Sequence, residues 1–215
     1  MLGFNGTMLR LTADEMLAEW KLRHGFTIGR RECAVERDDG IDLDAGLRCD
    51  IEVWYESLLA NAPAEWLPVY DIAGECRLEV NSDFSARLLL PASCRRVLEV
   101  KLPEWRRAVR VFEVPDSPRA RLQQYPWTRG GTESPVCVSA HRSLLLYSAA
   151  SASATVERVL AICAPEDGSY VFSPMAWVSL SENPNGTESP FIKLSDQNEW
   201  KNNYICRRRC CMSNR

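Results

Sequence analysis

The hydrophobic positions recur with a helical period in the first third of the chain. In a predicted helix over 12–24 the apolar residues fall on one face, and Thr12 and Glu15 have the spacing of a capping box at its start. A second amphipathic helix is predicted to begin at Asp42 or Asp44. Its apolar residues, which follow one another at helical spacing, are Leu47, Ile51, Trp54, Tyr55, Leu58 and Leu59.

After residue 67 the hydrophobic period changes to two, which indicates strands. The predicted strands lie at 76–80, 97–100, 109–114, 136–138, 143–147, 155–162 and 170–172. Ser173-Pro174 favours the start of a last short helix that reaches Leu180. Helices followed by antiparallel strands indicate an α+β fold.

We therefore expect one α+β domain over residues 1–180, helical over 11–62 and β-rich over 67–180. The segment 181–215 is polar and lacks periodicity, so we expect an extended tail there. Side chains on the inward faces of these predicted helices and strands should form the core. They are Trp20, Trp54, Tyr55, Leu58, Val97, Leu98 and Val100.

The stretch LLLPASCRRVLEVKLPEW, residues 88–105, combines apolar alternation with two arginines and a proline. Its two apolar runs predict a pair of core strands that present their arginines on the exposed side.

Composition fits a globular protein without a membrane span. The chain has 215 residues, 46% hydrophobic and 26% charged, and no stretch approaches the roughly 18 apolar residues that cross a bilayer. The first residues lack the apolar run of a signal peptide, and the nine cysteines contain no C-x-x-C pair, so we expect reduced thiols in the cytosol. Cys206, Cys210 and Cys211 lack the second half of a zinc site, and we expect no metal there.

No motif fixes a chemistry. There are two histidines, His24 and His141, and no P-loop, G-x-G-x-x-G, H-E-x-x-H or G-x-S-x-G pattern. The residues from Asp42 onward do not fit an EF-hand calcium loop. Its sixth position would be Leu47 where glycine is required, and its twelfth would be Val53 where glutamate is required. We therefore expect no catalytic residue, no cofactor, no metal and no small-molecule substrate.

Charge is distributed unevenly, although the net charge is only −3. Residues 32–83 carry 14 acidic and 3 basic side chains, whereas residues 87–129 carry 10 basic and 4 acidic ones. Aromatic residues lie among these arginines, so the basic segment is suited to contact a neighbouring subunit or DNA. The candidate contact residues are Arg95, Arg96, Arg106, Arg107, Arg110 and Arg129.

Leu88-Leu89-Leu90-Pro91, then Arg95-Arg96 and the apolar run to Val100, resembles a pattern in head–tail connector and adaptor proteins of tailed bacteriophages. In those proteins a strand ends in leucine-proline, a short link carries an arginine, and an apolar strand follows. The order of helices and strands over 11–180 is also similar.

The resemblance implies a non-enzymatic structural or assembly protein, a phage or prophage virion component that joins a ring or connector. It would associate with copies of itself or with neighbouring virion proteins, first in the host cytoplasm and then in the virion. The alternative is a cytosolic nucleic-acid- or protein-binding module that uses residues 87–129. An enzyme ranks third.

Overall fold

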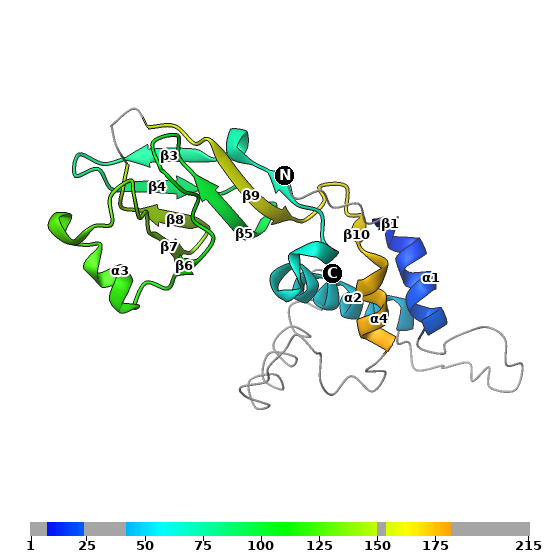
Figure 1. Ribbon diagram of the computed structural model, residues 1–215. Helices are drawn as coiled ribbons and strands as arrows, with labels where there is room; N and C mark the ends of the chain where they lie inside the picture. Colours follow the sequence, from blue (N-terminus) through cyan, green and yellow to red (C-terminus); the bar gives the residue numbers. More distant parts are fainter. Residues whose placement is uncertain (1–7, 24–41, 150–153, 182–215) are drawn as a thin grey trace, which may run out of the picture.

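The computed structural model describes residues 8–23, 42–149 and 154–181 and has an α+β fold, as predicted (Figure 1). The helices are α1 (Ala13–Arg23), α2 (Leu43–Asn61), α3 (Pro118–Leu122) and α4 (Pro174–Ser181), with 3-10 turns η1 (Ala64–Trp66), η2 (Ala73–Glu75) and η3 (Pro126–Thr128). The strands are β1 (Leu9–Leu11), β2 (Tyr70–Asp71), β3 (Arg77–Val80), β4 (Ala86–Leu89), β5 (Cys94–Lys101), β6 (Phe112–Glu113), β7 (Cys137–Ala140), β8 (Ser143–Leu146), β9 (Arg158–Cys163) and β10 (Tyr170–Phe172).

The starts of both long helices follow from the capping residues. At α1 the Thr12 backbone N–H donates to the Glu15 carboxylate at 2.8 Å, and the Glu15 N–H donates to the Thr12 hydroxyl at 3.3 Å. At α2 the Asp42 carboxylate accepts from the Ala45 N–H at 3.1 Å. Each contact satisfies a backbone N–H that the helix itself leaves without an acceptor. Both predicted starts are confirmed; the predicted end at His24 lies outside the described residues.

The strands form three sheets. Their orders are β1-β10, β2-β9-β5 and β3-β4-β8-β7-β6. All pairs are antiparallel except β6 and β7, which are parallel. Figure 1 shows α1, α2 and α4 gathered with β1 and β10 at one end of the molecule, and the five-stranded sheet with α3 at the other. The three-stranded sheet lies between these ends.

The expectation of one strand pair in residues 88–105 is wrong. β4 pairs with β3 and β8, whereas β5 pairs with β9, so the two apolar runs belong to different sheets. The link through Pro91 carries the chain from one sheet to the other, because proline offers no N–H to a ladder and ends the first strand.

The core is divided into two main clusters by the three-stranded sheet. The helical core contains the buried side chains of α1, α2, β10 and α4, including Met16, Ile51 and Phe172. The sheet core lies between the three-stranded and five-stranded sheets and includes Leu88 and Trp105. Of the predicted core residues, the helical core holds Trp20, Trp54, Tyr55, Leu58 and Leu98, and the sheet core holds Val97 and Val100. Trp54, Val97 and Leu98 are partly buried and the other four are buried.

The helical core includes residues of β10 and α4, near the end of the described chain, so residues 11–62 alone do not form it. Trp177 of α4 stacks on Trp54 of α2 with ring centroids 5.6 Å apart and planes 11° apart, and Phe172 meets Trp54 edge-on at 5.4 Å. The Tyr55 hydroxyl accepts from the Val171 N–H at 3.0 Å and lies 3.3 Å from the Val171 carbonyl oxygen, to which it donates. β10 and α4 therefore close the apolar face that α1 and α2 present.

We expect Trp54→Ala to lower the free energy of unfolding by about 3–5 kcal/mol, because the truncation leaves a cavity among Trp20, Phe172 and Trp177. Urea unfolding followed by circular dichroism measures it. Trp127→Ala is the matched control: this side chain is 82% exposed, so its loss should change the free energy by less than about 0.5 kcal/mol. A Trp54→Ala loss below about 1 kcal/mol would contradict the assignment of Trp54 to the core.

Candidate interaction surfaces

The six arginines proposed as contact residues all have partners within the chain, and the structure distributes them over four places. Arg95 and Arg96 reach α2, Arg106 and Arg107 reach the loop before β7, and Arg110 and Arg129 each bind a separate carboxylate. Their role in contacts with other molecules stays a prediction. The local geometry shows what each of them holds in place.

Arg95 and Arg96 join β5 to the second half of α2. Arg95 Nε donates to the Glu56 carboxylate at 2.9 Å, and the Arg96 guanidinium donates to the carbonyls of Ala60 at 3.0 Å and Ala62 at 2.6 Å. Consecutive residues of a regular strand point to opposite faces. Here a register irregularity between Cys94 and Arg96 allows both arginines to reach the same helix. Arg96 places a cation at the C-terminal end of α2, where the helix dipole favours it.

An open groove of about 370 Å³ lies beside these arginines, between β5 and the β7–β8 hairpin. Arg95, Arg96 and Arg142 line it together with Ser139 and Phe112. The Arg96 Nε is buried without a hydrogen-bond partner, and burial lowers the pKa of the Arg96 guanidinium. The groove contains none of the other four proposed arginines.

Arg110 and Arg158 hold the carboxylate of Glu99 on β5. The Glu99 side chain is only 5% exposed; its Oε2 accepts from Arg110 Nε at 2.7 Å, and its Oε1 lies 2.5 Å from Arg158 Nη2. Burial acts to raise the pKa of this carboxyl, but the Arg110 hydrogen bond and the Arg158 charge outweigh it, so the pKa lies below its usual value. Arg110 thus neutralises a buried charge of its own chain.

Arg106 and Arg107 lie in the loop after β5 and not on a strand. Both contact neighbouring residues of one loop: Arg106 pairs with Glu133 at 2.7 Å, and Arg107 donates to the Ser134 hydroxyl at 2.7 Å. The Arg106–Glu133 pair is well exposed on both sides, and such surface pairs contribute little to stability.

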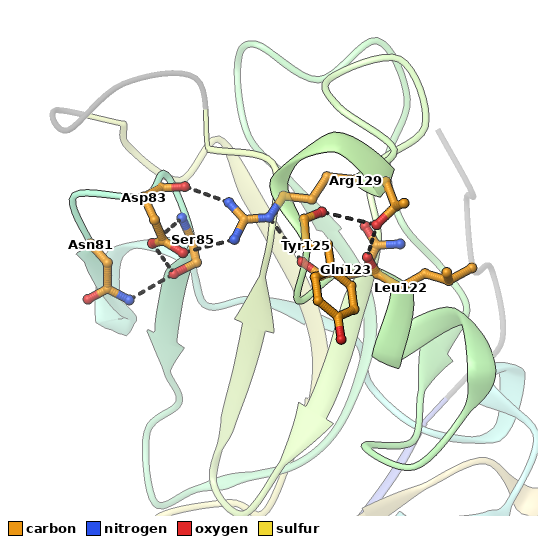
Figure 2. Close-up of polar contacts among 8 residues, drawn as sticks. Asn81, Asp83, Ser85, Leu122, Gln123, Tyr125 and Arg129 are labelled. Atoms are coloured by element: carbon orange, nitrogen blue, oxygen red, sulfur yellow. Dashed lines mark hydrogen bonds and ion pairs between the residues drawn. The ribbon is translucent and has the colours of Figure 1, made fainter.

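Arg129 is almost fully enclosed, with a side chain 9% exposed. Figure 2 shows its guanidinium between the β3–β4 turn on one side and the segment after α3 on the other. It donates to the Asp83 carboxylate at 2.8 Å, to the Asp83 carbonyl and to the Gln123 carbonyl at 3.0 Å, and it lies 5.6 Å from the centre of the Tyr147 ring. Hydrogen bonds from Ser85 and Arg129 hold the pKa of the Asp83 carboxyl well below its usual value.

An exposed apolar surface follows α3, and sequence reasoning did not identify it as one site. Leu122 and Tyr125 are about half exposed, Trp127 is far more so, and Tyr125 and Trp127 stack at 5.7 Å. We name these three residues the aromatic knob. The sequence gives one local sign that these side chains are exposed. The aromatic residues lie among Pro126, polar residues and two glycines, without the alternation that marks a buried strand.

The residues considered for catalysis or metal binding form no metal cluster in the described part of the chain. No group of three His, Cys, Asp or Glu side chains there has the arrangement of a metal site. His141 lies in the turn between β7 and β8 and is exposed. Cys206, Cys210 and Cys211 lie outside the described residues.

Five of the nine cysteines fall in the described ranges, and all five are free thiols. Cys49 is exposed, while the others are half-buried or buried. Cys94 and Cys163 are direct cross-strand partners. Burial raises the pKa of Cys76 to about 11 and that of Cys94 to about 12, so these thiols are protonated and weakly nucleophilic near neutral pH.

Comparison with protein-family models, with curated proteins and with solved structures gave no match. Within the described ranges, no helix is both long and apolar enough to span a bilayer.

We expect Glu99→Gln to lower the free energy of unfolding by about 1–3 kcal/mol at pH 7, because Arg110 and Arg158 lose their charged acceptor. A carboxyl whose pKa is depressed by folding stabilises the protein above its unfolded pKa of about 4.3, and this contribution is lost as the pH falls through the lower folded value. The difference between wild type and variant should therefore shrink below about pH 4. Urea unfolding between pH 7 and pH 3 measures it.

Glu104→Gln is the control for this experiment, since Glu104 is exposed and has no ion pair within the described residues. It should change stability by less than about 0.5 kcal/mol at either pH. An equal loss for Glu99→Gln at pH 3 and pH 7 would show that packing, and not charge, is responsible.

Proposed function

We propose that this protein is a non-enzymatic structural subunit that joins a connector or ring in the virion of a tailed phage or prophage. The observation that carries the proposal is the difference between the two ends of the molecule (Figure 1). One end is helical and acidic, and the other is sheet-based, basic and exposes aromatic side chains. Residues 88–105, which resemble connector and adaptor proteins, run from β4 of the five-stranded sheet into β5 of the three-stranded sheet.

The acidic surface consists of residues 42–75, which carry eight acidic side chains and a single basic one, Arg48. Some of this charge is used within the fold, as in the Glu56–Arg95 pair. Glu52, Glu65 and Glu75 are exposed and have no ion pair within the described ranges. They leave a net negative field on the surface of α2 and the turns that follow it.

The basic surface consists of residues 106–129, which carry six arginines and two acidic residues. Two of these arginines, Arg110 and Arg129, are engaged with carboxylates as described above. Arg121 of α3 is exposed and has no ion pair within the described residues. The opposite sign of the two surfaces favours contact between unlike ends of two copies.

Contact between unlike ends is heterologous, and repeated heterologous contacts close into a ring when the rotation between copies allows it. A connector in a tailed virion requires a closed ring of this kind. The alternative function, a nucleic-acid-binding module, would need several free cations along one groove, whereas each of the six proposed arginines has a partner in its own chain.

We expect the purified protein to associate at about 10–100 µM, and the association to weaken as salt rises from about 50 to 500 mM, because exposed charges are screened beyond roughly 10 Å at 0.1 M salt. Multi-angle light scattering gives the mass at each salt concentration. The double variant Glu52→Lys, Glu65→Lys should associate much more weakly at low salt. Glu104→Lys, which makes the same kind of charge change outside residues 42–75, should associate as the wild type does.

Arg110 is unsuitable for such a charge reversal. Its loss would remove one of the cations that neutralise the buried Glu99 carboxylate, and this would lower stability. A wild-type mass that stays monomeric at every concentration would contradict the proposal. Tight binding of duplex DNA with a steep salt dependence would favour the nucleic-acid module in its place.

A further inference from the structure

We infer that the aromatic knob, Leu122, Tyr125 and Trp127, is the anchor by which one copy of this protein docks on the acidic surface of the next copy. The inference rests on the proposed function, because it names the contact that would hold neighbouring subunits together. It is carried by the exposure of the knob, by the polar contacts that support its backbone and by the charge of Arg121 beside it.

Exposed apolar side chains are concentrated in one short stretch of the chain. Among the described residues nine large hydrophobic side chains are exposed, and five of them lie between residues 111 and 127. They are Val111, Val114, Leu122, Tyr125 and Trp127. Single exposed apolar residues are ordinary, but exposed apolar side chains that lie together favour an interaction site, and Tyr125 and Trp127 are in contact. Tryptophan and tyrosine are also the residues that most often dominate the binding energy of protein interfaces.

Polar contacts support the backbone of the segment that carries the knob, and Figure 2 draws several of them. The Thr128 hydroxyl reaches the carbonyls of Leu122 and Tyr125, and the Gly130 N–H donates to the Gln123 side chain at 3.2 Å. Gln123 itself is buried, and Arg129 fastens the segment to Asp83. A segment whose backbone is ordered before binding loses less conformational entropy on docking, so this support favours affinity.

The chemistry around the knob favours a protein partner over a nucleic acid. Tyr125 and Trp127 already stack on each other, and the other exposed large hydrophobic residues near them in sequence, Val114 and Leu122, are aliphatic. Arg119 pairs with Glu113 at 3.4 Å, and Arg129 pairs with Asp83. Arg121 is then the cation of residues 118–129 without an ion pair in the described chain, which is too few for a strand of phosphates.

A second copy of the chain offers the matching surface. Glu52 of α2 and Glu65 of η1 are exposed carboxylates without ion pairs in the described residues, and Tyr70 of β2, the strand that follows η1, is 45% exposed. This surface combines negative charge with an aromatic side chain, which complements Arg121 and the knob. α2, which carries Glu52, lies at the helical end of the molecule, and α3, which leads into the knob, lies at the other end, so a copy cannot dock on itself and must bind its neighbour (Figure 1).

The experiment measures the dissociation constant of self-association by sedimentation at about 50 mM salt. We expect Trp127→Ala and Tyr125→Ala each to raise it by about tenfold or more, and Trp127→Phe to raise it by less than about threefold. Leu22→Ala is the control, since Leu22 is an exposed apolar residue of α1 outside both surfaces. It should leave the constant unchanged. Unchanged urea midpoints for the knob variants would show that folding is intact.

Mixing two defective variants tests the head-to-tail geometry directly. One variant carries Trp127→Ala and retains its acidic surface; the other carries Glu52→Lys, Glu65→Lys and retains its knob. In a heterologous contact the two should form a one-to-one complex that cannot grow further. If the knob instead met another knob, the mixture would form no such complex, and the inference would be overturned.

The remaining outcomes separate this inference from the proposed function. Wild-type association that Trp127→Ala and Tyr125→Ala leave unchanged would overturn the role of the knob while the ring subunit stands. A wild type that is monomeric throughout would overturn both. If the monomer binds a 20-nucleotide single strand and Trp127→Ala abolishes this binding, the knob is a nucleic-acid contact and the inference is overturned.

Discussion

The fold depends on a three-stranded sheet, β2-β9-β5, that is apolar on both faces. Along β9 the side chains of Val159 and Ala161 enter the sheet core, while Ile162 enters the helical core. β5 is divided in the same way, with Leu98 on the helical side and Val100 on the other. A one-residue slip between β5 and β9 would exchange the residues that each core receives, so both cores fix the same register. The helices and the five-stranded sheet are positioned relative to each other by this single layer.

The charge asymmetry of the sequence has two parts in the structure. One part is neutralised within the fold: Glu56 of the acidic region pairs with Arg95 of the basic region, and Asp83 pairs with Arg129. These pairs join segments that are 39 and 46 residues apart, so they fasten α2 to β5 and the β3–β4 turn to the segment after α3. The other part stays on the surface, around Glu52 at one end and Arg121 at the other. Only this second part is free to act between molecules, and it is smaller than the sequence counts indicate.

Local signals predicted the elements well, because their causes are local. The Thr12–Glu15 capping box and the Asp42 cap depend on residues three positions apart, and the alternation of β3 matches its alternating burial, whereas the burial of β5 and of the end of β9 does not alternate. The placement of the two strands in residues 88–105 was not predictable, since periodicity does not say which strand is the neighbour. α3 is only five residues long and gave no periodic signal. The partners of the six arginines depend on a strand irregularity and on long-range approach, and neither leaves a pattern in the sequence. The aromatic knob could be seen as composition but not as a surface.

The closure of the helical core by Trp177 has a consequence for synthesis on the ribosome. α1 and α2 leave the exit tunnel early, but the tryptophan that covers Trp54 is translated more than a hundred residues later. Translation proceeds at roughly 5–20 residues per second, so Trp177 is synthesised at least several seconds after the aromatic face of α2 that it buries. During that interval the nascent chain exposes Trp20 and Trp54 together, a surface that chaperones recognise. The order of translation therefore makes the first helices the last part of the described fold to be completed.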